Sequence, residues 1–125
     1  MIKDDTAKPE TDLKKRTKEF AIRIIRLYGS LPKTTEAQVL GKQVLRSGTS
    51  VGAHYREAQR AKSNADFISK MEGGLQELEE TGYWLELLVE SAIVRDELLA
   101  PLRDETEQLL AIFVSIVTKV KKQKN

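Results

Sequence analysis

The sequence predicts an all-α protein, an up-down-up-down four-helix bundle. Apolar residues recur at alternating steps of three and four through four segments of the 125-residue chain. No segment alternates apolar and polar residues as a half-buried strand does. Short polar breaks separate the segments, so neighbouring helices should pack nearly antiparallel. We expect helices over roughly residues 12–29, 35–62, 64–94 and 97–122 of a single domain spanning 12–125, after a polar, disordered tail over 1–11.

The first helix should begin at Asp12, whose carboxylate can cap the first turn. Gly29 and Pro32 end it, because glycine permits a left-handed cap and proline cannot continue a helix. Its apolar seam, broken only by Thr17, consists of Leu13, Phe20, Ile24, Leu27 and Leu31.

The second helix should start with a capping box over residues 35–38 and contains an unusual run of small residues over 47–53. The run could be a phosphate-binding loop, a break between two helices or part of one continuous helix. No Gly-Lys-Ser/Thr follows it, and the apolar residues keep their phase across it, which favours the continuous helix. Gly41, Gly48 and Gly52 then fall on one side, where another backbone can approach closely.

The third helix should be capped by Ser63 or Asn64, and the fourth should hold Pro101 near its first turn and lysines in its last turn. Between residues 82 and 89 the third helix is apolar nearly all round, which predicts burial on more than one side. A partner subunit would cover the outer side. The candidate oligomer-interface residues are Tyr83, Trp84, Leu87 and Leu88; the alternative is a monomer with a wet apolar face.

Charge is segregated along the chain although the formal net charge is only +2. Residues 1–62 hold 14 Lys and Arg against 7 Asp and Glu (+7), and residues 63–125 hold 7 against 12 (−5). A small total usually argues against nucleic-acid binding, but a domain with one basic half can present a basic face.

The basic residues of the second helix form one outward stripe, at spacings of 4, 10 and 4. Such a stripe could follow phosphates along an RNA or DNA backbone; the alternatives are a solvated face or ion pairs with a neighbouring subunit. The candidate nucleic-acid-binding residues are Lys42, Arg46, Arg56 and Arg60, together with Lys14, Lys15 and Lys18 of the first helix.

Other charged residues flank the apolar seams at heptad-like spacing, which is typical of pairing across helices and favours a role in assembly and register. They are Arg16, Arg23 and Arg26 in the first helix and Glu72, Glu79, Glu86 and Glu90 in the third.

Little in the sequence points to an enzyme. There is no cysteine and one histidine, His54, for which a partly buried hydrogen-bonding role is favoured over catalysis. Paired carboxylates among Glu77, Glu79 and Glu80 are the remaining option, and they are typical of a solvated or interfacial face. We therefore expect no enzymatic activity, no metal, no cofactor and, since no apolar run is long enough to span a membrane, a cytoplasmic location.

A resemblance to a known family rests on the segments 31–33, 40–53, 56–58, 61–63, 66–67, 79–81 and 83–85, with Arg46–Ala53 the most specific. The chain resembles the bacterial four-helix-bundle family named after intervening sequences in 23S ribosomal RNA genes, itself similar to the accessory variability protein of diversity-generating retroelements. His54, where asparagine is expected, and Gly82, where a larger, usually acidic residue is expected, depart from the pattern.

The resemblance covers about residues 20–116 and implies a ring-like homopentamer. For the retroelement relatives it also implies binding to nucleic acid and to a reverse transcriptase. Two functions follow as hypotheses: a homo-oligomer that binds nucleic acid in support of an RNA-processing or reverse-transcription partner, and a pure protein scaffold without nucleic-acid binding.

Overall fold

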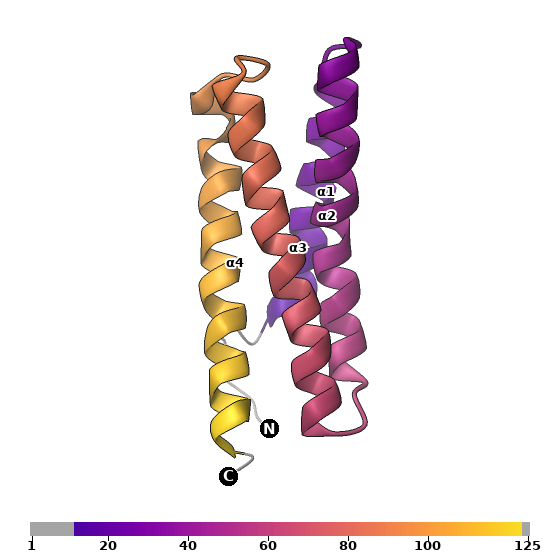
Figure 1. The fold of residues 1–125 in the computed structure, drawn as a ribbon, viewed down its shortest axis with the longest axis vertical. Coiled ribbons are helices and arrows are strands. Elements are labelled where there is room, and N and C mark those ends of the chain that lie inside the picture. Colours follow the sequence, from indigo (N-terminus) through magenta and orange to yellow (C-terminus); the bar gives the residue numbers. More distant parts are fainter. Residues whose placement is uncertain (1–11, 124–125) are drawn as a thin grey trace.

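The computed structural model describes residues 12–123, which form four helices and no strand. The helices are α1 (Leu13–Ser30), α2 (Thr35–Gln59), α3 (Asn64–Glu90) and α4 (Asp96–Gln123). Each runs antiparallel to the one before it, with α1 and α2 forming one side and α3 and α4 the other in Figure 1. This confirms the predicted all-α four-helix bundle. The expected tail over residues 1–11 lies outside the described residues.

The core runs along the axis of the bundle and is built from the predicted seams. Its largest fully buried side chains include Leu13, Phe20, Ile24, Val44, Val51, Met71, Leu78, Leu85, Leu88, Leu109 and Phe113. Four polar residues, Thr17, Ser47, Thr81 and Thr106, are also fully buried. Their hydroxyls are all hydrogen-bonded, which is what a buried polar group requires.

The helix N-termini show which capping predictions hold. Asp12 occupies the cap position of α1 but its side chain makes no capping hydrogen bond. Thr34, rather than Thr35, caps α2 by accepting a hydrogen bond from the backbone N–H of Ala37 (3.3 Å). Ser63 caps α3 by accepting one from the N–H of Asp66 (3.0 Å).

Two helices end earlier than predicted. α2 ends at Gln59 instead of residue 62, because the chain must turn to reach the cap of α3. α3 ends at Glu90 instead of residue 94, since Ala92 adopts a left-handed conformation (φ 62°). The N–H groups of Ile93 and Val94 then both donate to the carbonyl of Leu88 (3.0 and 3.1 Å), which closes the end of the helix.

α2 is continuous through its small residues, as predicted, and it lies very close to α1. A Cβ atom added at Gly48 would lie 2.7 Å from Cγ1 of Ile24, and one at Gly41 would lie 2.6 Å from Cδ1 of Leu31. Gly52 faces Thr17 in the same way, at 3.2 Å from Oγ1. The absence of side chains at these positions therefore sets the separation of the two helices.

α1 and α4 approach each other over a much shorter stretch than the other neighbouring helices. Arg16 joins them: its guanidinium donates to both carboxylate oxygens of Glu105 (2.9 and 2.8 Å) and to Oε1 of Gln108 (2.9 Å). The hydrogen bond to Glu105 raises the pKa of Arg16 above its ordinary value. The pairing predicted for Arg16 across helices thus exists within the chain.

Candidate nucleic-acid interface

A shallow groove separates the outer edges of α1 and α2 and has a cation on either side. Its volume is about 320 Å³. Lys18 of α1 and Arg56 of α2 both line it and both are exposed. The other lining residues are small and uncharged: Thr17, Ala21, Thr49, Gly52 and Ala53. The groove therefore offers positive charge above a surface that a polymer backbone can approach closely.

Further cations extend this surface along both helices. Lys14 and Lys15 lie in the first turn of α1, and Lys42 lies on α2, all exposed. At 1.5 Å per residue, Lys42 and Arg56 are about 21 Å apart along the helix axis. Within residues 12–123, neither Arg56 nor any of the four lysines Lys14, Lys15, Lys18 and Lys42 forms an ion pair. We call the set Lys14, Lys15, Lys18, Lys42 and Arg56 the basic face.

Arg46 is separate from the basic face. Its guanidinium contacts Glu77 (3.1 Å) and Glu80, both on α3, and its side chain is half exposed. The hydrogen bond to Glu80 and the charge of Glu77 raise the pKa of Arg46 above its ordinary value, although desolvation opposes them. Two carboxylates of the same chain therefore balance the charge of Arg46. One alternative from the sequence is ion pairs with a neighbouring subunit; the pairs observed for Arg46 lie within one subunit.

Arg60 lies one residue beyond the last residue of α2, at the C-cap position. Its backbone N–H donates to the carbonyls of Glu57 and Ala58 rather than continuing the helix. The outward stripe predicted for residues 42–60 therefore ends, as a helical stripe, at Arg56. Arg60 is exposed beside that end.

His54 is half-buried between α2 and α3, against the backbone of Gly73. A Cβ at Gly73 would lie 2.8 Å from the imidazole Nδ1, so the ring occupies the space that glycine leaves. The other ring nitrogen, Nε2, lies 3.7 Å from Oε2 of Glu77, longer than a hydrogen bond. Nδ1 is buried and has no hydrogen-bond partner among the described residues. The predicted partial burial is present, and the predicted hydrogen bond is not formed at this nitrogen.

The carboxylates considered for catalysis do not converge on a common site. Glu77 and Glu80 both point at Arg46, and Glu79 is exposed on the outer face of α3. Over residues 12–123 no three metal-ligating side chains of the His, Cys, Asp or Glu type gather into a group that could hold a metal ion.

The four residues predicted to contact a partner subunit divide into two kinds. Tyr83 is 54% exposed and Leu87 is partly exposed, both on the outer side of α3. Trp84 packs partly against the core, with its indole N–H buried and without a hydrogen-bond partner among residues 12–123. Leu88 is fully buried in its own bundle, so it cannot be a subunit contact. That prediction is corrected: α2 packs on more of α3 than one apolar seam suggests.

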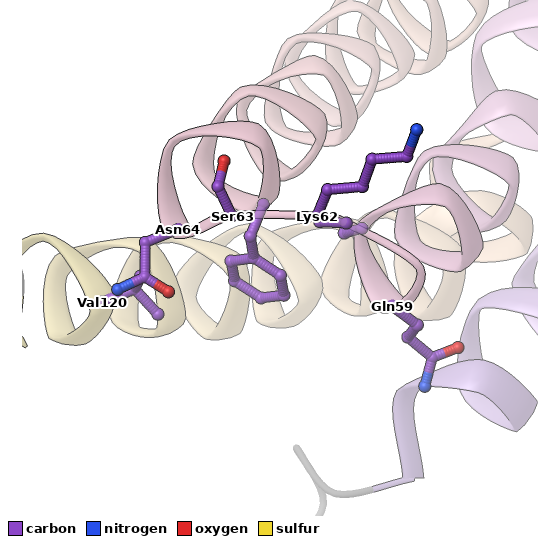
Figure 2. Close-up of a pocket in the computed structure, with 8 residues that line it drawn as sticks. Gln59, Lys62, Ser63, Asn64 and Val120 are labelled. Carbon is purple, nitrogen blue, oxygen red and sulfur yellow. The ribbon is translucent and has the colours of Figure 1, made fainter.

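A second hollow, of about 490 Å³, lies at the turn between α2 and α3 (Figure 2). Its polar groups serve the turn itself, because Ser63 caps α3 and the carboxylate of Asp66 accepts a hydrogen bond from the N–H of Lys62 (3.2 Å). In Figure 2 the side chains of Gln59 and Lys62 extend to different sides of the chain. We assign no ligand to this hollow.

Sequence reasoning missed the small residues of α1 that form the groove, Thr17 and Ala21. The sequence places Thr17 only in the seam, and in the structure its hydroxyl donates to the carbonyl of Leu13 (2.7 Å). The signal was present, since small residues face each other on both helices only where two backbones approach.

None of the four helices combines the length and the apolar character that crossing a membrane requires, as far as residues 12–123 show.

Comparison with known proteins places this fold in a family. The sequence model of the family described as 23S rRNA-intervening sequence protein matches residues 10–115. A crystal structure of a protein of unknown function from the S23 ribosomal protein family of Bacteroides thetaiotaomicron VPI-5482 is 39% identical, with a TM-score of 0.82. The match covers 87% of this chain and 97% of that one. A comparison with curated proteins finds no match. The chain belongs to the 23S rRNA-intervening sequence protein family.

Proposed function

We propose that this protein is a non-enzymatic homo-oligomer that binds nucleic acid through the basic face. The observation that carries the proposal is the α1–α2 groove, in which Lys18 and Arg56 flank a floor of small residues and neither cation is paired with a described carboxylate. Cations without acidic partners can pair with the phosphates of a nucleic acid, and the small residues between them let its backbone come close.

The chemistry of the basic face favours backbone contacts over base recognition. Duplex DNA carries one negative charge per ~1.7 Å of its axis, so cations spread over ~21 Å of α2 can meet several phosphates. Such contacts contribute affinity that depends on salt and not on sequence. Exposed aromatic side chains, which would stack on bases, are not part of the basic face. Both RNA and DNA remain in scope as partners.

Assembly is the second part of the proposal. Tyr83 and Leu87 leave an apolar patch on the outside of α3 that a second copy would cover. The resemblance to the family implies five copies in a ring, and a ring repeats the basic face around its circumference. Resemblance to the retroelement accessory protein adds an RNA-processing or reverse-transcription protein as partner, in the cytoplasm.

The test reverses charge inside and outside the basic face. Lys18→Glu with Arg56→Glu changes the two groove cations, and Lys33→Glu with Lys122→Glu changes net charge equally at exposed positions elsewhere. Fluorescence anisotropy with labelled RNA and DNA, over a salt series, measures binding. We expect the groove variant to bind nucleic acid much more weakly than the wild type. The plot of log association constant against log salt concentration should also become less steep, its negative slope shrinking by about 1.4–1.8, that is 0.7–0.9 for each of two phosphate contacts.

The control pair should keep the slope of the wild type. Equal binding by wild type and groove variant at low salt would refute the basic face as the binding site. No salt-dependent retention by the wild type, together with a stable oligomer in light scattering, would establish the pure scaffold instead.

A further inference from the structure

The outer side of α3 near its C-terminal end combines exposed apolar and acidic side chains. Tyr83 is 54% exposed and stacks at a tilt against Trp84, with ring centroids 5.1 Å apart. Leu87 lies one turn further on. Exposed carboxylates surround these two residues, and none of them forms an ion pair with another residue in 12–123. We call this surface the α3 face: Glu79, Tyr83, Glu86, Leu87 and Glu90.

A groove of complementary character lies between α1 and α4. Its volume is about 330 Å³, and apolar side chains form most of its lining: Leu27, Val94, Leu98, Leu99 and Leu102. Leu98 is 68% exposed, the highest value among the large apolar side chains of the described chain. Arg23 and Arg26 also line the groove, are exposed, and make no ion pair within the described part of the chain.

Both surfaces lie at the same end of the bundle. The α1–α4 groove is formed by the last turns of α1, the α3–α4 connection and the first turns of α4. The α3 face is formed by the last turns of α3, which run to that same end in Figure 1. The two surfaces belong to different faces, since α3 takes no part in the groove. Two copies with parallel axes can therefore bring one surface against the other.

We infer that the α3 face of one copy docks into the α1–α4 groove of the next copy. The inference rests on the homo-oligomer part of the proposed function and names the two surfaces that build it. Tyr83 and Leu87 cover Leu98, while Glu86 and Glu90 face Arg23 and Arg26. A contact between two different surfaces is heterologous, so an open chain of copies keeps one free surface at each end until a ring closes.

Charge selects a second copy of this chain as the occupant. Acidic groups surround the apolar centre on one surface and basic groups line the other, so the α3 face repels another α3 face and the groove repels another groove. The heptad spacing of these charges suits pairing across helices. Arg16 of the same heptad set finds Glu105 within its own chain, which leaves Arg23 and Arg26 for a partner.

Charge exchange tests the pairing. Variant one carries Arg23→Glu and Arg26→Glu, variant two carries Glu86→Arg and Glu90→Arg, and a third carries all four changes. Light scattering gives the mass of each, and circular dichroism verifies that each is helical. Glu107→Arg is the control, because Glu107 is exposed on α4 outside both surfaces.

We expect each double variant to be monomeric at concentrations where the wild type is assembled, with the dissociation constant raised about a hundredfold or more by like charges. An equimolar mixture of the two should form assemblies larger than a dimer, because each contact between the two variants joins opposite charges: an unaltered α3 face meets an unaltered groove, and a reversed α3 face meets a reversed groove. The fourfold variant should reassemble, and Glu107→Arg should behave as the wild type.

The failures are distinguishable. A wild type that is monomeric at all concentrations overturns the proposed homo-oligomer and this inference together. A wild-type oligomer that variant one leaves intact, or a mixture that stays monomeric, overturns this inference alone. Should a double variant lose its helical signal, Arg23→Gln with Arg26→Gln replaces it, and an unchanged assembly state of that variant overturns the inference equally.

Discussion

α2 packs against α1 and against α3 by two different kinds of contact. Toward α1 it presents glycines, and Gly48 lies so close to Ile24 that an added Cβ would be 2.7 Å from a side-chain carbon. Toward α3 it presents polar groups: the hydroxyls of Ser47 and Thr81 are 2.8 Å apart in the core, and Arg46 bridges to α3 at the surface. One helix thus uses shape on one side and hydrogen bonding on the other.

The difference has a functional side. Close packing through glycine leaves a shallow groove with small walls between α1 and α2, and cations outside the contact stay unpaired. On the side facing α3, Arg46 forms ion pairs with carboxylates of that helix, so its charge is neutralised within the chain. The α1–α2 side is therefore the one that can offer cations to a ligand, although all these basic residues belong to the same two helices.

The largest expected effect comes from filling the glycine contact. Gly48→Val should lower the free energy of unfolding by about 3 kcal/mol, because overpacking costs 1–3 kcal/mol and β-branched Ile24 has few other rotamers in a helix. Urea unfolding followed by circular dichroism measures it. The control is Gly29→Ala, where an added Cβ meets nothing within 4 Å.

That control should stabilise the protein by up to ~1 kcal/mol, the helix-propensity gain of alanine over glycine. An unchanged stability of Gly48→Val would mean that α2 is free to move away from α1, and shape would no longer explain the separation of the two helices.

A smaller effect should follow from removing the buried hydroxyl pair. Ser47→Ala leaves the Thr81 hydroxyl with one partner fewer in the core, and we expect a loss of about 1–2 kcal/mol in unfolding free energy. Combining it with Thr81→Val completes a double-mutant cycle. A coupling of about 1 kcal/mol between the two changes is expected; strict additivity would show that the 2.8 Å contact adds nothing to the contact between α2 and α3.

The two sides of α2 were not equally predictable. Glycines at one phase of a helical pattern indicate a close approach wherever they occur, so the shape-based contact could be expected from the spacing alone. The partners of Arg46 could not, because periodicity gives the direction of a side chain from its own helix and not which neighbour lies there. Glu77 and Glu80 were visible as acids, and only the register of α2 against α3 brings them to Arg46.

The same reasoning explains the error at Leu88. A seam read from one helix allows for one buried stripe, whereas α3 is buried by α2 on one side and α4 on the other. Leu88 turns inward and is fully buried, whereas Tyr83 and Leu87 keep part of their surface outside. The end of α3 could not be predicted for a different reason: Ala92 has no sequence signature of the left-handed conformation that it adopts.

The smallest expected effect concerns the surface bridge on the polar side of α2. Arg46→Gln removes the contacts to Glu77 and Glu80, and because the arginine side chain is half exposed we expect a loss below ~1 kcal/mol in unfolding free energy. The loss should shrink as salt is raised, since screening weakens exposed pairs. Lys42→Gln is the matched control on the same helix: Lys42 is exposed, lies outside the last turn of α2 and has no acidic partner among residues 12–123, so the stability of the variant should equal that of the wild type at every salt concentration. If both variants showed the same salt dependence, the ion pairs of Arg46 would add no stability beyond that of an unpaired surface charge. The Ser47–Thr81 hydrogen bond would then be the polar contact that stabilises the packing of α2 on α3.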